Sequence, residues 1–357
     1  MHLKAYFLTN QNLKIKTKGV FHMFEDKIDF VILWVDGNDP NWLKEKESYM
    51  QLSNNNNINR FRDWENLQYL FRGIEQYANW VNKIYFVTWG HVPKWLNLKN
   101  NKLEIVKHED FIPKSYLPTF NSNVIEMNLH RIPNLCEKFV LLNDDLFFLN
   151  KTKPNDFFKN GLPRDIYIEK QKKNPSQRHI SIRQNYMDLI NFYFNKKLQT
   201  KTNFFKHFNL TYGISNFYTL INLLKYTNYT DFVNVHLNKN FLKSTFKYVW
   251  NKEYPKLDLS CKNKFRANSD IGINLFRYWQ LIKGDFIPSK SLGKYFSIKE
   301  NNYKLLNTIK YKKYKKYKKY KIICINDDTV NVNYENIKNE INGAFENKFP
   351  NKCEYEL

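Results

Sequence analysis

The feature that most constrains the fold of this chain is a series of short, nearly uninterrupted apolar runs that alternate with amphipathic segments. Four such runs occupy residues 28–35, 84–88, 103–106 and 139–142. Runs of this length and composition are typical of strands that are buried on both faces, as in a parallel sheet. Residues 63–80 carry apolar side chains at the spacing of one helix face, and residues 123–135 predict another helix. The alternation predicts a doubly wound α/β sheet.

Two of these runs end in acidic turns, which are Asp36-Gly37-Asn38-Asp39 and Asn143-Asp144-Asp145. If the two strands are parallel, both turns lie at the same edge of the sheet, where ligands of such folds bind. Paired carboxylates such as Asp144 and Asp145 suit a divalent cation that in turn binds phosphate oxygens. The alternative at both places is a solvated acidic turn.

Three further side chains are candidates for chemistry, and each has a structural alternative. Glu126 follows Asn123 at the spacing of a capping box, so the residues alone favour a helix cap. His236 lies between apolar neighbours, and it is either a half-buried structural histidine or a base whose pKa suits neutral pH. Arg266 is either a bidentate clamp for a phosphate or one surface charge among many.

The formal net charge of +23 indicates an anionic partner, which is a nucleic acid, an anionic lipid or an anionic substrate. Residues 310–321 repeat Tyr-Lys-Lys and favour contact with an anionic membrane surface over nucleic acid, with a solvated linker as the alternative. The four cysteines lack CxxC spacing, so we expect free thiols and no zinc site. Residues 1–20 lack the apolar core of a signal peptide, and no run approaches the ~18 apolar residues that span a bilayer.

Taken in chain order, these motifs resemble the conserved blocks of the Stealth family. That family comprises bacterial capsular polysaccharide phosphotransferases and the animal phosphotransferase that tags lysosomal enzymes. The first block resembles residues 28–40, and Leu33 departs from it where the family more often has Thr. The resemblance continues at residues 60–63, 116–122, Glu126, 130–133, 142–145, the region around His236, and 324–328.

The resemblance implies a transferase that moves a hexose-1-phosphate from a UDP-sugar, such as UDP-GlcNAc, to a saccharide hydroxyl and releases UMP during capsular polysaccharide synthesis. It implies a catalytic centre made of Glu126, Asp145, His236 and Arg266. We expect the donor to be contacted by Asp36, Gly37, Asp39, Asn143 and Arg62. We expect Mg²⁺ or Mn²⁺ to be held by Asp144 and Asp145.

The same comparison predicts a glycosyltransferase-A-like Rossmann core with a more helical second lobe. The expected divisions are a lead-in at 1–25, a nucleotide-sugar core at 26–150, a helical insertion or acceptor lobe at 151–260, and the remainder of the catalytic domain at 261–357. We expect a cytoplasmic enzyme that attaches peripherally to the inner face of the bacterial cell membrane.

Two other functions are open at this point. A conventional glycosyltransferase also uses a UDP-sugar and paired carboxylates, but it releases UDP. A basic nucleic-acid-binding protein has the charge, although the chain contains no recognisable binding motif and its acidic turns oppose that function.

Overall fold

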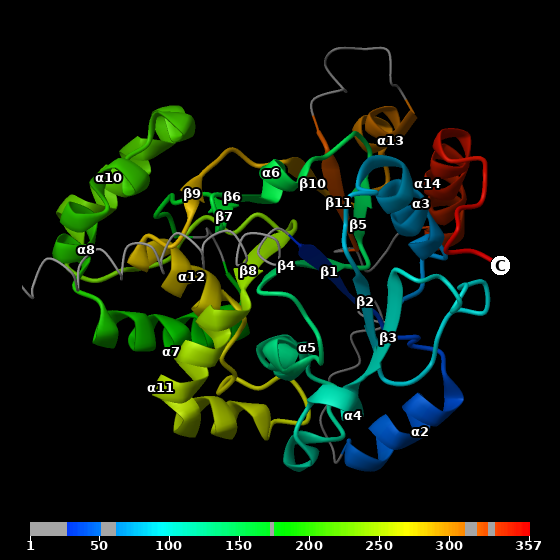
Figure 1. Cartoon of the computed structure of the whole chain (residues 1–357), viewed down its shortest axis with the longest axis horizontal. Helices are drawn as coiled ribbons and strands as arrows, with labels where there is room; N and C mark the ends of the chain where they lie inside the picture. Colours follow the sequence, from blue (N-terminus) through cyan, green and yellow to red (C-terminus); the bar gives the residue numbers. More distant parts are fainter. Residues whose placement is uncertain (1–26, 51–61, 172–174, 311–319, 328–332) are drawn as a thin grey trace, which may run out of the picture.

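A five-stranded sheet in the order β3-β2-β1-β4-β8 lies at the centre of the computed structural model (Figure 1). Its strands are β1 (Ile28–Leu33), β2 (Ile84–Thr88), β3 (Leu103–Lys107), β4 (Lys138–Asn143) and β8 (Lys239–Leu242). The structure describes residues 27–50, 62–171, 175–310, 320–327 and 333–357. The expected lead-in and residues 311–319 of the Tyr-Lys-Lys segment lie outside these ranges.

Both faces of the central sheet are buried. Strands β1, β2, β3 and β4 are parallel, and β8 pairs antiparallel with β4 as an edge strand. Because side chains alternate along a strand, Phe30 contributes to the hydrophobic core on one face and Val31 to the core on the other. Burial on both sides explains why the inner strands β1, β2 and β4 are apolar along most of their length, whereas the edge strand β3 carries exposed Glu104 and Lys107.

Helices cover each face of the sheet, which confirms the predicted α/β class. One core includes side chains of α3 (Leu67–Tyr77), α13 (Tyr303–Lys310) and α14 (Tyr334–Lys348). The opposite core includes side chains of α5 (Ser122–Asn128), α11 (Lys243–Cys261) and α12 (Asn274–Lys283).

The helix predicted over residues 123–135 was too long. Helix α5 ends at Asn128 and passes into a 3₁₀ turn, η3 (Leu129–Arg131). Pro133 disfavours helical geometry at the residue before it, and Asn134 adopts a positive φ of 59°. The early end of α5 leaves Glu126 in the last turn of a short helix instead of the middle of a long one.

Two smaller sheets flank the central one. The first has the order β10-β11-β5 and consists of β10 (Gly293–Ser297), β11 (Ile322–Asn326) and β5 (Leu146–Phe148). The second has the order β6-β7-β9 and consists of β6 (Phe158–Lys159), β7 (Leu162–Asp165) and β9 (Ile287–Pro288). Through the first of these sheets, the C-terminal strand β11 lies beside the chain that leaves β4.

Residues 151–260 contain the most extensive run of helices, as expected, and also supply β8 to the central sheet. The helices before β8 include α7 (Gln177–Tyr193), α8 (Lys196–Thr202), α9 (Phe204–His207), η4 (Leu210–Ser215) and α10 (Asn216–Lys225). The divisions placed at residues 25, 150 and 260 stay predictions. The cysteines form no disulfide, and no helix within the described ranges combines the length and apolarity needed to cross a bilayer.

Candidate active site

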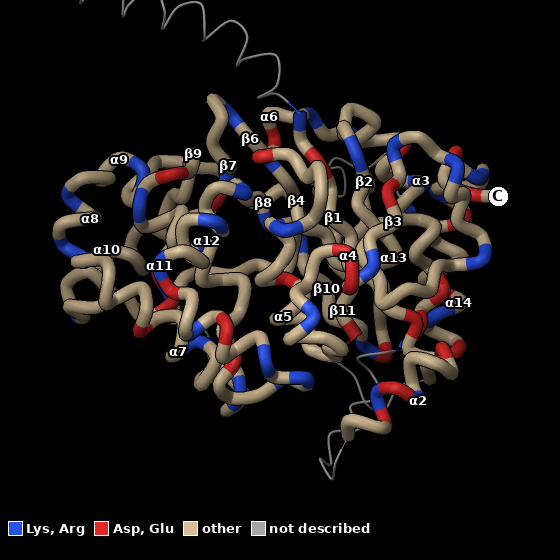
Figure 2. Tube along the Cα trace, turned by 60° about the horizontal axis from the view of Figure 1, so that its bottom comes forward, with Lys and Arg blue, Asp and Glu red and all other residues tan. Residues whose placement is uncertain are grey.

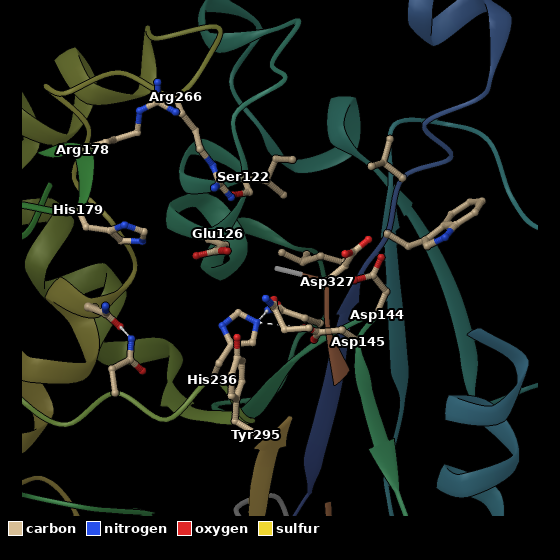
Figure 3. A pocket seen from close by; sticks show the side chains of 18 of the residues that line it. Ser122, Glu126, Asp144, Asp145, Arg178, His179, His236, Arg266, Tyr295 and Asp327 are labelled. Atoms are coloured by element: carbon tan, nitrogen blue, oxygen red, sulfur yellow. Dashed lines mark hydrogen bonds and ion pairs between the residues drawn. The ribbon is translucent and has the colours of Figure 1, made fainter. Parts of the chain in front are cut away.

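A cavity of about 1290 Å³ opens at the carboxyl ends of β1 and β4 (Figure 3). It is lined by all four residues of the predicted catalytic set, Glu126, Asp145, His236 and Arg266. Of the other predicted site residues, Arg62, Asn143 and Asp144 also line it. The cavity therefore unites predicted site residues that are up to 204 positions apart in the chain, between Arg62 and Arg266.

The antiparallel pairing of β8 brings His236 to Asp145. Leu141 of β4 is paired with Lys239 of β8, so the chain that enters β8 runs beside the chain that leaves β4. His236 Nε2 lies 3.2 Å from Asp145 Oδ2 and 3.2 Å from Asn143 Nδ2. Since both neighbours approach Nε2, the other ring nitrogen, Nδ1, is left to face the cavity.

Cys324 completes a compact group with this pair. The ligand atoms of Asp145, His236 and Cys324 all lie within 4.8 Å of one another. The Cys324 thiol donates to Asp145 Oδ2 over 3.1 Å, while Asp145 Oδ1 is buried with no hydrogen-bond partner among the described residues. A carboxylate oxygen in that position is suited to a cation, so these residues can hold a divalent metal. Sequence analysis had placed Cys324 in the last family block, but it assigned this residue no role beyond that of a free thiol.

A second set of carboxylates stands beside this group. Figure 3 shows Asp144, Asp145 and Asp327 together on one side of the cavity. Desolvation raises the pKa of Asp144, which lines the cavity, to about 7, and the charge of Asp145 adds to that shift. Asp327 pairs with Arg62 at 3.2 Å, and this contact anchors the predicted donor-binding arginine in the cavity wall.

Glu126 does not cap its own helix. The N-cap of α5 is Asn121, whose side chain accepts a hydrogen bond from the backbone N–H of Asn123, so the capping-box interpretation was wrong. The Glu126 side chain instead extends into the cavity (Figure 3). Burial raises the pKa of its carboxyl, while the positive charges of Lys239 and Arg266 oppose that shift.

Asp270 connects Arg266 to the helix that carries Glu126. Its fully buried carboxylate accepts hydrogen bonds from the side chains of Asn121 at 2.9 Å and Asn123 at 3.0 Å. It also accepts from the backbone N–H of Ala267 at 3.1 Å. Arg266 itself donates to Ser122 Oγ at 2.5 Å. The sequence offered no signal for Asp270, because the two asparagines that bind its carboxylate lie 149 and 147 positions away.

The wall opposite the carboxylates is basic. Figure 3 shows Arg178, His179 and Arg266 on that side, and Lys170 and Arg183 line the same cavity. Arg183 is 3.7 Å from Asp231, which partly neutralises it. Sequence analysis missed these residues, because the chain has 57 lysines and arginines in total and no local pattern distinguishes the ones that line the cavity. The cavity thus has one acidic and one basic side, with Glu126 and His236 between them.

The first acidic turn has a different environment. Asp36, Gly37 and Asp39 follow β1 at the expected edge of the sheet but are not among the residues that line the cavity. Asp39 caps α2 (Pro40–Tyr49) by accepting from the backbone N–H groups of Asn41 and Trp42. Their contact with a nucleotide stays a prediction, as do the catalytic and donor-binding roles of the cavity residues.

Comparisons with known proteins confirm the first two sequence blocks. Residues 26–53 match the model of Stealth protein conserved region 1, and residues 60–166 match that of conserved region 2. The chain is 43% identical over 336 residues to the capsular polysaccharide phosphotransferase WcwK of Streptococcus pneumoniae, covering 93% of this chain and 98% of WcwK.

Two further relatives show the same breadth of similarity. The exopolysaccharide phosphotransferase cps2G of Lactiplantibacillus plantarum is 37% identical over 92% of this chain and 96% of its own length. The receptor polysaccharide phosphotransferase WefC of Streptococcus gordonii is 36% identical over 93% of this chain and 99% of its own length. Among solved structures, the galactosyltransferase LgtC aligns over 88% of this chain and 95% of its own, with 10% identity and a TM-score of 0.39.

Proposed function

Because this chain belongs to the Stealth family of polysaccharide phosphotransferases, we propose that it transfers a hexose-1-phosphate from a UDP-sugar to a saccharide hydroxyl and releases UMP. The named relatives act on capsular, exopolysaccharide or receptor polysaccharides, and we assign this chain to the same kind of pathway. UDP-GlcNAc or a similar UDP-hexose is the proposed donor. The products are a sugar phosphodiester and UMP.

The observation that carries this proposal is the meeting of Glu126, Asp145, His236 and Arg266 in one cavity. They come from a helix, a strand end and two separate loops, so no local folding requirement brings them together. A negatively charged donor is matched by the basic wall, and a reacting hydroxyl needs a base beside it. Both requirements are met within the same space.

His236 is the proposed base. In the reaction, the acceptor oxygen forms a bond to the phosphorus that carries the sugar, and the bond between that phosphorus and the UMP oxygen breaks. The anomeric C–O bond stays intact. His236 Nδ1 takes the hydroxyl proton in the tautomer in which Nε2–H donates to Asp145 Oδ2 at 3.2 Å, and the Asp145 carboxylate then stabilises the imidazolium.

Arg266 and Glu126 have complementary proposed roles. Arg266 stabilises the negative charge of the transferring phosphoryl, with Arg178 adding positive charge on the same wall. Its hydrogen bond to Ser122 holds the guanidinium in place before the donor arrives. Glu126 has no hydrogen-bond partner for its carboxylate among the described residues, and we assign it to orienting the acceptor hydroxyl.

A divalent cation, Mg²⁺ or Mn²⁺, is part of the proposal. The unpartnered Oδ1 of Asp145 fits it, since Oδ2 already serves His236 and Cys324. Asp144 and Asp145 are the residues that hold it, and when bound it offsets the charge of the donor pyrophosphate. We also propose a cytoplasmic location with peripheral attachment to the inner face of the membrane, and no nucleic-acid partner.

The test is a donor screen. The purified chain is incubated with a panel of UDP-sugars and oligosaccharide primers, the nucleotide product is identified, and the saccharide product is examined by phosphorus NMR. We expect UMP together with a phosphodiester resonance. Release of UDP with no phosphorus in the saccharide would contradict the proposal and indicate a conventional glycosyltransferase.

A further inference from the structure

One end of the molecule exposes a dense group of apolar side chains, here called the apolar end face. It is formed by α8, α9, η4 and α10, which lie at the end opposite the C-terminus (Figure 1, Figure 2). Its members are Leu198, Phe204, Phe205, Leu210, Ile214, Phe217, Leu220, Ile221 and Leu224. Leu210 is 97% exposed, Ile214 91% and Phe205 82%. Scattered apolar residues are normal on a surface, but so many exposed apolar side chains within residues 198–224 indicate a contact site.

The helices of this face are inverted, with polar side chains inside and apolar ones outside. In α8, Lys196 is buried and its Nζ donates to Glu169 Oε1 at 2.9 Å and to the Asn222 carbonyl at 2.8 Å. In α10, the one buried side chain is that of Thr219, whose hydroxyl accepts from the Glu169 backbone N–H. Rotating these helices so that their apolar side chains face inward would leave the buried Glu169 carboxylate without Lys196. The apolar residues are therefore held outward by satisfied polar contacts.

The charge of this segment has a single sign. Between Asp188 and Asp231 the chain contains no aspartate or glutamate, but it contains five lysines. Lys196 forms the buried ion pair with Glu169. Lys197, Lys201 and Lys225 are exposed on the same helices as the apolar side chains. Apolar side chains flanked by lysines, with no acidic residue among them, match the interfacial region of an anionic bilayer.

We propose that the apolar end face docks this protein onto an anionic lipid bilayer, with its leucine, isoleucine and phenylalanine side chains inserted below the lipid headgroups. This assigns a contact surface other than the Tyr-Lys-Lys segment to the peripheral attachment described above. A second copy of the chain fits less well, because a two-fold contact sets each patch against itself and so confronts lysines with lysines. Headgroup phosphates instead complement that charge.

The face adjoins the cavity. Lys170, which lines the cavity, places its Nζ 3.7 Å from the ring centre of Tyr218 in α10, and the neighbouring Glu169 is bonded to Thr219 of the same helix. Docking through α10 therefore sets one wall of the cavity next to the membrane. If the proposed function holds, acceptor saccharides anchored in that membrane reach the site without leaving the surface.

The experiment compares two double variants of the full chain for binding to phosphatidylglycerol vesicles and to phosphatidylcholine vesicles. Leu210→Gln with Ile214→Gln alters the apolar end face, and Leu98→Gln with Tyr303→Gln alters apolar residues that are 54% and 68% exposed elsewhere. We expect the wild type and the control to sediment with the anionic vesicles. The end-face variant loses at least about tenfold in partitioning, because inserted leucine and isoleucine side chains are each worth that much.

Three outcomes would overturn the inference. The first is that the end-face variant binds vesicles like the wild type, and the second is that only replacement of the lysines in residues 310–321 abolishes binding. The third is that the wild type forms a dimer in sedimentation velocity and that the end-face variant loses this dimer without a change in vesicle binding. Nucleotide release with a water-soluble primer is measured in parallel and is expected to be equal in all variants. Absence of UMP release with vesicle binding lost only in the end-face variant would refute the proposed reaction and leave the membrane contact standing.

Discussion

Replacement of His236 by alanine tests the proposed mechanism most directly. A positioned general base contributes about 10²–10⁴-fold to a rate, so the variant loses about 3–5 kcal/mol of transition-state stabilisation. The side chain is 43% exposed, and its polar contacts with other described residues are those with Asp145 and Asn143. We therefore expect a change of less than about 0.5 kcal/mol in the free energy of unfolding. The predicted signature is a large loss of turnover in a chain that is as stable as the wild type.

The assay measures UMP release under single-turnover conditions, together with thermal unfolding of the same preparations. His179→Ala is the matched control, since His179 also lines the cavity and is exposed, while its ring pairs with Ser176. We expect the control to lose much less activity. Turnover of His236→Ala within a few-fold of the wild type, or an equal loss in both variants, would refute the assignment of the base.

Three further changes have defined outcomes. Arg266→Lys keeps the charge but lacks the planar fork, so we expect about a tenfold or greater loss of kcat for UMP release with folding intact by circular dichroism. Lys196→Met leaves Glu169 buried without its cation and destabilises the chain by about 3–5 kcal/mol in urea unfolding, whereas an unchanged midpoint would show that the pair is dispensable. Burial lowers the pKa of His108 to about 4, that of His130 to about 3 and that of His207 to about 4. These side chains therefore stay neutral in the folded chain, whereas the unfolded chain takes up protons below pH 6.5. The free energy of unfolding therefore decreases as the pH is lowered, by about 2 kcal/mol per histidine at about pH 5. A melting temperature that stays constant between pH 7 and pH 5 would contradict this.

The parts of the site that could be predicted are those with a local cause. Asp145 was identifiable because it follows a strand whose apolar composition marks it as buried, and its place at the sheet edge follows from parallel pairing. His236 and Arg266 have no comparable local signal, and only their order relative to the family blocks singled them out. Glu126 shows the limit of local reasoning, because the capping box is a valid pattern that the true N-cap, Asn121, overrides.

Residues that act through distant contacts were beyond reach. Cys324 belongs to the site because β11 pairs with β5, immediately after Asp145. Asp270 ties the loop that carries Arg266, through the Ala267 N–H, to Asn121 and Asn123, and the basic wall depends on the packing of α7. Each of these depends on long-range pairing, which leaves no trace in residue spacing.

By itself, the sequence determined the α/β class, the four parallel strands of the central sheet, the acidic strand ends and the family, because these depend on local periodicity and on the order of motifs. The tertiary structure decided which side chains share a cavity, which nitrogen of His236 faces Asp145, and which helices present apolar side chains to solvent. The physical reason is the same in each case. A strand register or a buried ion pair such as Lys196–Glu169 is formed between segments far apart in the chain, so its energy appears only when the chain is folded.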